Sequence, residues 1–566
     1  MKKFTLLVFA AIMTMAASAQ KAIMPPKSLH NNAATQTMAE RQMRVNPLRH
    51  NSNILGKLEM KDQAKTSPRT ATRAAGSQII TEAPAGKAVS YTRSGDSWMV
   101  YIFYILGMSY DSFMGDFVYA DDNTVYIKNP FSQFPTDSYL KGTIDGDEIV
   151  VSLPQDIYEE DYYGYVYVYQ ADRYVFDAAD QYYYKDTENS EIRYKIKGDS
   201  VVWDEVDNGD VILGIGDDSG WAGYGDYNTV YAPMTDTKVE LPAGMQTEDW
   251  VMTYNGDGHF VDVGFDGNTV YIGNISTDLP GTYIKGTVDG DRITIDGGQY
   301  IGDFEAANSH VYMVTCDIDS LWDDLYMEYY VDYTLTDKIE FTYDAASKTI
   351  SPVPGEDVSL IANCGKNVIY YLTAYDNPTF KYQAPFTGAV KPMPAEFTDF
   401  FPYDPFYGYG YCRFNLPKVD TEGRLLETDK MYYNMFIDDE LFTFYPDEYI
   451  YLTEEMTDIP YDFSDSYDIY VTGADHTIYF YTTGFEKLGI RSTYTADNGE
   501  TADSDITWYY LTPTGITAAP ETGKNVKSVS YTDLSGRRIS APAKGLYIKT
   551  VTFDDGTVKS YKSMKR

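Results

Sequence analysis

Residues 141–147 read Lys-Gly-Thr-Ile-Asp-Gly-Asp, and residues 285–291 read Lys-Gly-Thr-Val-Asp-Gly-Asp. In each copy a short run with β-branched residues reaches Asp-Gly-Asp, and a second such run follows it. The glycine supplies the positive φ angle of a two-residue hairpin turn, and β-branched residues favour extended strands. The stretch therefore predicts an antiparallel β-hairpin that occurs twice in the chain.

The similarity between the two copies extends to both sides of these hairpins. The matching segments are 123–127 with 268–272 (Asn-Thr-Val-Tyr-Ile), 84–86 with 242–244 (Pro-Ala-Gly), and 228–231 with 367–370 (Asn-Thr-Val-Tyr against Asn-Val-Ile-Tyr). A period of about 150 residues indicates tandem globular domains and not a solenoid. We therefore predict two homologous β domains, at 79–241 and 242–393.

The fold class predicted for the chain is all-β, because Val, Ile, Tyr, Phe and Thr runs alternate with turn clusters from residue 79 onwards. Each repeat has room for seven to ten antiparallel strands, and either a barrel or a sandwich would bury this pattern. The two repeats resemble uncharacterised secreted bacterial β domains. The sequence alone leaves the choice between barrel and sandwich open.

A third domain is predicted at 394–514, where the sequence pattern changes after Pro392-Met393-Pro394. The run Leu488 to Tyr494, followed by Asn498-Gly499-Glu500 and by Ser504, is similar to the final strands of a fibronectin type III-like sandwich. The resemblance covers roughly 100 residues and implies a β-sandwich. It carries no activity with it, because such sandwiches serve as spacers or binding platforms.

Residues 515–566 form a small C-terminal β module in this interpretation. It contains Val529 to Ile539 with Gly-Arg-Arg, Gly-Leu-Tyr-Ile-Lys at 545–549, and a basic last strand at 555–562. These features resemble the C-terminal sorting domain of type IX secretion cargo. The resemblance implies export and sorting machinery as partners, and release or surface attachment with the module removed. A plain terminal β module is the alternative.

The first 19 residues have the parts of a signal peptide, with Lys2 and Lys3 before an apolar run and Ala17-Ser18-Ala19 as the cleavage site. We expect cleavage after Ala19 and a secreted or outer-surface location. No stretch approaches the roughly 20 apolar residues of a membrane helix. The sequence thus predicts no transmembrane segment.

The net charge of −39 is unevenly distributed. Residues 21–78 and residues 523–566 each hold ten basic and three acidic side chains, and the first 19 residues hold two Lys, which leaves −55 on residues 79–522. Residues 20–78 have few aromatic or β-branched side chains, so we predict a disordered basic spacer there. A body this acidic repels nucleic acid, which we exclude as a partner.

No catalytic constellation stands out in the sequence, and we predict neither catalytic nor metal-binding residues. Two of the five histidines lie in the spacer, and none of the others has a second histidine at metal-ligand spacing. His310 aligns with Tyr165 of the first repeat and is expected at a strand surface. Residues 207–210 and 217–220 faintly resemble calcium loops but lack the twelve-residue spacing with a closing Glu, so weak calcium binding is the sole cofactor alternative.

Three cysteines (Cys316, Cys364 and Cys412) are too few to staple a chain of 566 residues. Each lies among apolar or aromatic neighbours. We predict buried free thiols and not a disulfide framework.

Tyrosine offers the best candidate for a ligand-binding surface, since the chain has 55 of them. In residues 163–169 strict alternation places every Tyr on one face of a strand and both Val residues on the other. A second run, at 403–411, opens the third domain. Tyr rings stack on sugars and anchor protein partners. The candidate ligand-binding residues are Tyr163, Tyr165, Tyr167, Tyr169, Tyr407 and Tyr409.

These observations favour a secreted or cell-surface binding or adhesion protein without enzymatic activity. Its partner would be a glycan or a host or cell-surface protein, bound through exposed Tyr stripes. One alternative is a secreted carbohydrate-active hydrolase that uses two carboxyl groups, which would lie about 5 Å or 6.5–9.5 Å apart in a cleft. The other alternative is an inert stalk or spacer.

Overall fold

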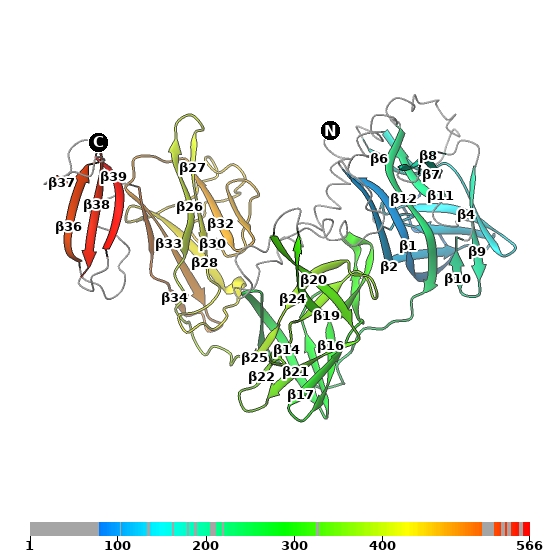
Figure 1. The fold of residues 1–566 in the computed structure, drawn as a ribbon, viewed down its shortest axis with the longest axis horizontal. Helices are drawn as coiled ribbons and strands as arrows, with labels where there is room; N and C mark the ends of the chain where they lie inside the picture. Colours follow the sequence, from blue (N-terminus) through cyan, green and yellow to red (C-terminus); the bar gives the residue numbers. More distant parts are fainter. Residues whose placement is uncertain are drawn as a thin grey trace. The chain divides into compact units, whose positions relative to one another are not determined.

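Figure 1 shows the computed structural model, which describes residues 79–566 except 102–103, 133–135, 161–163, 178–179, 186–189, 204–210, 218–219, 324–327, 512–525, 534–537, 540–544, 554–557 and 566. The predicted signal peptide and spacer thus lie outside the described residues. The chain is nearly all β and divides into two compact units, residues 1–385 and 386–566. The predicted all-β fold class is confirmed. Among the described residues, no helix has the length and hydropathy needed to span a bilayer.

The first repeat contains a ring of eight antiparallel strands. Each strand of the ring pairs with the next, and the last pairs with the first. In ring order these are β1 (Lys87–Tyr101), β2 (Tyr104–Tyr119), β3 (Thr124–Lys128), β4 (Tyr139–Asp145), β5 (Glu148–Ser152), β9 (Glu191–Lys197), β10 (Ser200–Val202) and β12 (Gly220–Pro233). The ring closes because β12 is hydrogen-bonded to β1, more than 100 residues earlier.

The second repeat forms a closed barrel with the same order of strands. Its strands are β13 (Glu248–Tyr254), β14 (Asp257–Asp266), β15 (Thr269–Gly273), β16 (Tyr283–Asp289), β17 (Arg292–Asp296), β21 (Lys338–Asp344), β22 (Thr349–Pro352) and β25 (Thr379–Tyr382). The repeats are therefore barrels, which decides between the two folds that the sequence left open.

In each repeat, further strands form a second sheet. In the sequence they follow the fifth strand of the barrel and precede the last one. In the first repeat this sheet holds β6 (Gln155–Glu160), β7 (Gly164–Asp177), β8 (Asp180–Lys185) and β11 (Val211–Asp217). In the second it holds β18 (Gln299–Phe304), β19 (Ser309–Asp323), β20 (Glu328–Thr336), β23 (Val358–Asn363) and β24 (Tyr371–Asp376), with the short 3₁₀ turn Glu305–Ala307 before β19. The two repeats thus have equivalent second sheets as well as equivalent barrels, and in the first repeat β11 also pairs with β12 of the barrel.

The repeated hairpins form as predicted. Asp145 pairs with Glu148 and Asp289 pairs with Arg292, so each turn holds two residues. Gly146 has a φ of 66°, the left-handed conformation that glycine adopts without a steric cost. The strands that precede these hairpins are β3 and β15. In both, Val and Ile are fully buried and Thr and Tyr face the other side, as the alternation predicted.

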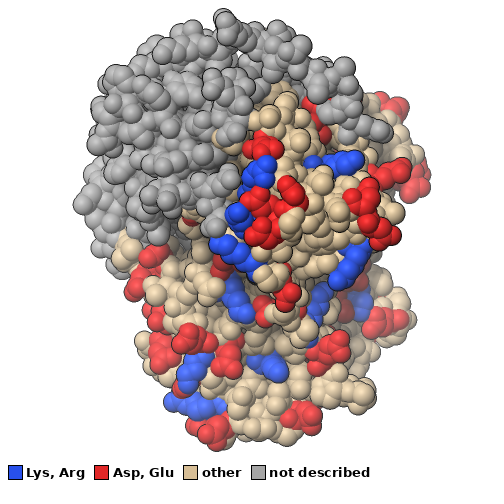
Figure 2. All heavy atoms as spheres, turned by 90° about the vertical axis from the view of Figure 1, so that its right-hand side faces the viewer, with Lys and Arg blue, Asp and Glu red and all other residues tan. Residues whose placement is uncertain are grey.

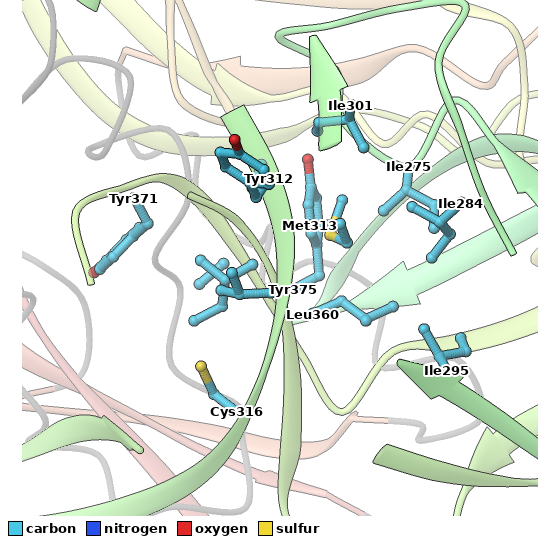
Figure 3. Packing of buried hydrophobic residues seen from close by; sticks show 14 of the residues in the cluster. Ile275, Ile284, Ile295, Ile301, Tyr312, Met313, Cys316, Leu360, Tyr371 and Tyr375 are labelled. Atoms are coloured by element: carbon cyan, nitrogen blue, oxygen red, sulfur yellow. The ribbon is translucent and has the colours of Figure 1, made fainter. Parts of the chain in front are cut away.

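The core of the second repeat is shown in Figure 3, where Ile284 and Ile295 of the barrel lie among Ile301, Met313 and Leu360 of the second sheet. The cysteines Cys316 and Cys364 belong to this core and Cys412 to that of the second unit. All three are buried free thiols, so the prediction for them is confirmed.

The two repeats also share part of this core. Tyr110 and Phe113 lie on β2 of the first repeat, yet both pack in the core of the second. Phe113 pairs with Ser309 at the start of β19. Next to it, the Asp111 carboxylate accepts hydrogen bonds from the backbone N–H groups of Lys366 (3.0 Å) and Asn367 (2.6 Å). The two repeats are therefore packed together in one structural unit and are not independent domains.

The register of the last barrel strand corrects one part of the repeat alignment. Tyr231 of β12 lies opposite Arg93, and Phe380 of β25 lies opposite Met252, the residue that corresponds to Arg93. Residues 228–231 therefore correspond to 377–380 and not to 367–370. Asn228 (φ 50°) and Asn377 (φ 46°) share the left-handed conformation, which supports this assignment.

The second unit begins with a sandwich of two sheets. One sheet has the order β26 (Glu396–Asp404), β27 (Tyr409–Asn415), β32 (Asp475–Phe480), β31 (Ile469–Thr472). The other holds β28 (Met431–Ile437), β29 (Glu440–Leu441), β30 (Ile459–Pro460), β33 (Lys487–Thr495), β34 (Thr501–Asp503) and β35 (Thr507–Tyr510), with the 3₁₀ turn Thr428–Lys430 before β28. Buried residues of both sheets, among them Phe414 and Ile490, form a single core.

A separate four-stranded sheet ends the chain. Its order is β37 (Arg538–Ile539), β36 (Val526–Asp533), β38 (Gly545–Phe553), β39 (Val558–Lys565). The Gly-Leu-Tyr-Ile-Lys motif at 545–549 thus begins a central strand, β38, which pairs with β36 on one side and β39 on the other.

Charged side chains of both signs share the surface of the described residues. On the face drawn in Figure 2, Lys and Arg are interspersed with Asp and Glu. Many of the cations form surface ion pairs, such as Lys348 with Glu248 at 2.7 Å. Exposed pairs of this kind contribute little to stability, about 0–1 kcal/mol each.

The sandwich core contains one histidine that links stability to pH. His476 is fully buried, its ring lies within 5.5 Å of those of Phe414, Tyr433 and Tyr461, and Nε2 lies 3.0 Å from the Tyr461 carbonyl oxygen. Burial lowers the pKa of His476 below its usual value of about 6.5. The unfolded chain then binds the proton more readily than the folded one, so this contribution to stability falls as the pH falls below about 6.5.

We expect His476→Phe to remove this dependence. The difference in unfolding free energy between the natural protein and the variant, measured by urea denaturation, should shrink from pH 7.5 to pH 5. The carboxylates are common to both proteins and cancel in the difference. A difference that stays constant over this range would contradict the prediction.

Candidate functional site

The outer face of the sheet β26–β27–β32–β31 carries a row of aromatic side chains. Along β27, Cys412 and Phe414 point into the core, so Tyr409 and Tyr411 point to the opposite face. In the neighbouring strands Phe401 of β26 and Tyr479 of β32 lie directly opposite Tyr411. Pairing across three strands therefore brings Phe401, Tyr411 and Tyr479 into one row, and with Tyr407 and Tyr409 they make up what we call the aromatic face.

The rings of the aromatic face contact one another. The Phe401 and Tyr411 rings are stacked with centroids 5.6 Å apart and planes at 19°. The Tyr479 ring lies 5.6 Å from that of Tyr411 and 5.2 Å from that of Tyr409. All four are half-buried because each covers part of its neighbour. Contacts of this kind hold the rings in place and lower the entropy lost when a ligand binds.

The tip of the β26–β27 hairpin is the most exposed part of this surface. Phe406 is 87% exposed and Tyr407 is 59% exposed. The turn is held by Asp404, whose carboxylate accepts the Phe406 N–H at 2.8 Å and whose carbonyl oxygen accepts the Gly408 N–H at 2.8 Å. Two large aromatic side chains are thus presented to solvent on an ordered turn, an arrangement typical of a binding surface.

Polar groups border the rings. The Tyr411 hydroxyl donates a hydrogen bond of 2.8 Å to Asp399, and this bond raises the pKa of Tyr411. The Arg413 guanidinium lies 5.9 Å from the Tyr411 ring centroid. Burial raises the pKa of Tyr479 to about 12. These phenols therefore stay protonated at neutral pH, and the face offers both hydrogen-bond donors and acceptors beside its apolar rings.

The other predicted stripe, on β7, is only partly described. Tyr163 lies outside the described residues, and so does the side chain of Tyr165. Val166 and Val168 are buried, as the alternation predicted. Tyr167 is half-buried and contacts the Tyr169 ring at 5.8 Å.

Tyr169 corrects the expectation of an exposed stripe. Its side chain is only 2% exposed and belongs to the same core as Val166 and Val168. Tyr169 lies opposite Gly214 of β11. Its neighbour Val168, which points to the other face, is 0% exposed, so both faces of the strand are covered here and strict alternation does not expose the second one.

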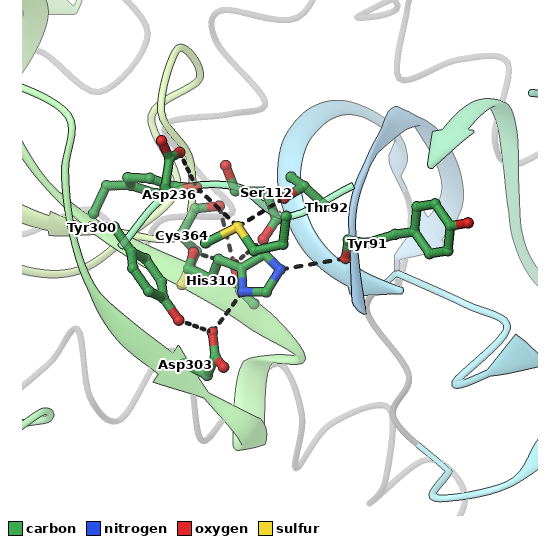
Figure 4. Close-up of polar contacts among 11 residues, drawn as sticks. Tyr91, Thr92, Ser112, Asp236, Tyr300, Asp303, His310 and Cys364 are labelled. Atoms are coloured by element: carbon green, nitrogen blue, oxygen red, sulfur yellow. Dashed lines mark hydrogen bonds and ion pairs between the residues drawn. The ribbon is translucent and has the colours of Figure 1, made fainter. Parts of the chain in front are cut away.

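His310 also differs from its expected place at a strand surface. It is 3% exposed, with Nδ1 2.5 Å from the Asp303 carboxylate and Nε2 3.4 Å from the backbone oxygen of Tyr91 in the first repeat. Figure 4 shows the ring between these two partners. The neighbouring repeat covers the position, which no property of the strand itself reveals.

The described residues contain no group of three or more His, Cys, Asp or Glu that could hold a metal ion. Of the two segments that resemble calcium loops, residues 207–210 and residues 218–219 lie outside the described residues. The aromatic face therefore stands as the candidate site, with Tyr407 and Tyr409 as its two predicted members.

Sequence reasoning missed Phe401 and Tyr479. They lie on different strands from Tyr409, and only the pairing of β26 and β32 with β27 brings them together. The alternation in Thr-Ile-Tyr-Phe at 477–480 was a usable signal, because it places Tyr479 on the face opposite the buried Ile478 and Phe480.

No protein-family model and no curated protein matches this chain.

Proposed function

We propose that the chain is a secreted or cell-surface binding protein without enzymatic activity, and that its aromatic face binds glycans. The observation that carries the proposal is the ordered set of Phe401, Tyr407, Tyr409, Tyr411 and Tyr479 on the outer face of one sheet. The signal-like first 19 residues and the tail that resembles a sorting domain support the location.

The chemistry of the face favours a sugar as its ligand. Sugars present apolar C–H edges beside hydroxyl groups, and tyrosine offers an apolar ring together with a polar tip. The Asp399 carboxylate and the Arg413 guanidinium add an acceptor and a donor next to the rings. The net charge of −55 on residues 79–522 disfavours highly anionic polymers, so we expect neutral glycans at this face.

A glycan-array screen of the full chain, with and without calcium, tests this proposal. We expect saturable binding that falls at least tenfold in the double variant Tyr411→Ala with Tyr479→Ala, because this variant has no rings in the centre of the face on which a sugar could stack. Phe265→Ala is the matched control, since Phe265 is 38% exposed and stacked on Tyr343 in the second repeat, outside the aromatic face.

The outcomes separate the candidate functions. Binding that Tyr165→Ala with Tyr167→Ala abolishes, and the double variant of the aromatic face does not, would move the site to the first repeat. A blank array in both conditions would overturn the glycan proposal and leave a protein partner or a spacer role. Release of reducing ends from an arrayed glycan would instead favour the hydrolase.

A further inference from the structure

A polar groove lies on the second repeat, beside the segment that joins the two barrels. Its cavity measures about 400 Å³. One wall is the connecting segment 235–240, and the other is formed by Tyr271, Lys285 and Tyr300 on β15, β16 and β18. Small-molecule sites have volumes of about 300–1,000 Å³, so the groove is large enough for one sugar ring.

The connecting segment that forms this wall is fixed at two points. The Asp236 carboxylate accepts hydrogen bonds of 3.0 Å from the Tyr312 hydroxyl and 3.0 Å from the Lys366 ammonium group. Three residues on, Val239 forms a β-bridge with Tyr283. The groove wall is therefore built into the fold and not a loop that happens to lie nearby.

The opposite wall is held equally firmly. The Gln299 side chain accepts the Lys285 N–H at 2.9 Å and donates to the carbonyl oxygens of Lys285 and Asp296, both at 2.9 Å. The Tyr300 hydroxyl donates to Asp303 at 2.7 Å, and Asp303 in turn contacts His310. Figure 4 shows Tyr300 and Asp303 at this end of the network, with Asp236 nearby. The Tyr300 ring is thereby oriented and remains half-exposed.

The charges in the groove indicate what it could bind. Among the residues that the structure describes, neither Lys238 nor Lys285 lies within ion-pair distance of a carboxylate, whereas Asp236 is already paired with Lys366. Lys238 acts on the charge of Asp303 from a greater distance. Glu240 is the other carboxylate in the lining. Two ammonium groups that line one hollow suit an anionic group on the ligand.

We propose that this groove binds a sugar unit that carries one carboxylate, of the hexuronic acid class. Lys238 and Lys285 would hold the carboxylate, Glu240 would accept hydrogen bonds from ring hydroxyls, and Tyr271 and Tyr300 would contact the apolar edge of the sugar. The site is separate from the aromatic face and does not depend on the function proposed for it.

Calorimetric titration of the full chain tests this site with three probes. Galacturonic acid has both the ring and the charge, galactose has the ring without the charge, and acetate has the charge without the ring. We expect galacturonic acid to bind at least tenfold more tightly than either of the others. Equal affinity for galactose, or equal affinity for acetate, would overturn the proposal, and so would the absence of galacturonic acid binding.

Two double variants locate the binding. Lys238→Met with Lys285→Met should weaken galacturonic acid binding at least tenfold. Lys338→Met with Lys381→Met removes the same charge from barrel strands outside the groove and should leave the affinity unchanged. An equal loss in both variants would show a general charge effect and overturn the assignment. The variant Tyr411→Ala with Tyr479→Ala should bind galacturonic acid normally, which separates this site from the aromatic face.

Discussion

Replacing Asp226 with alanine is expected to lower the free energy of unfolding by about 3–5 kcal/mol, because it leaves a charged guanidinium buried without its partner. Asp226 is fully buried inside the first repeat, and its carboxylate accepts a hydrogen bond of 2.7 Å from Arg93, which is 1% exposed. The same carboxylate accepts hydrogen bonds from the Ser132 N–H and hydroxyl and from the Tyr224 hydroxyl, at 2.7–2.8 Å. Urea denaturation would measure the loss.

The second repeat supplies the control for this experiment. In the second repeat, Met252 and Tyr375 occupy the positions that correspond to Arg93 and Asp226. Both residues are buried, so the second barrel closes without this ion pair. We therefore expect Arg93→Met combined with Asp226→Asn to be more stable than Asp226→Ala alone, because no buried charge remains. A loss below about 1 kcal/mol for Asp226→Ala would show that solvent reaches the pair, as it does in exposed ion pairs.

Phe113→Ala is expected to cost about 3–5 kcal/mol, the usual cost of removing a fully buried aromatic ring. Its ring is 0% exposed and lies 5.1 Å from that of Tyr110 and 5.9 Å from that of Tyr370. Because Phe113 belongs to the first repeat and packs in the core of the second, the loss should appear in the second repeat. Hydrogen exchange of amides in β19, β23 and β24 should accelerate.

Phe117→Ala is the matched control, four residues further along the same strand. Phe117 is also 0% exposed but packs in the core of the first repeat, against Tyr231 at 4.8 Å. Its removal should accelerate exchange in the first barrel and leave β23 and β24 protected. If Phe113→Ala gave the same exchange pattern as Phe117→Ala, the repeats would not share a core in solution.

Local features of the fold could be predicted from the sequence because local chemistry determines them. The Asp-Gly turns at 145–146 and 289–290 and the alternation in Thr-Val-Tyr-Ile need only neighbouring residues, and both form as expected. Closure of the barrels depends instead on pairing between β12 and β1 and between β25 and β13, more than 100 residues apart. Asn-Thr-Val-Tyr at 228–231 resembles Asn-Val-Ile-Tyr at 367–370 more than its structural counterpart Asn-Pro-Thr-Phe at 377–380, so the repeat alignment from sequence is wrong there.

The candidate site shows the same limit. Tyr407 and Tyr409 could be predicted from a dense aromatic run, but the outer face of a sheet is assembled from strands that are distant in sequence. The predictions for Tyr169 and His310 were wrong for the opposite reason. Tyr169 is buried in the core of the first repeat and His310 is covered by the neighbouring repeat, although alternation alone assigns both strand faces to solvent. Burial by another domain leaves no periodic signal in the strand that is buried.

The position of Tyr110 and Phe113 has a practical consequence for dividing the chain. A fragment cut between the repeats, near residue 241, would keep both rings on β2 but lack the side chains that cover them. Such a fragment would present a new apolar surface beside a partly unpaired strand, the combination that promotes aggregation of truncated proteins. Recombinant fragments and natural proteolysis products should therefore stay soluble when they retain residues 79–385 together, and should be prone to aggregation when they end inside that range.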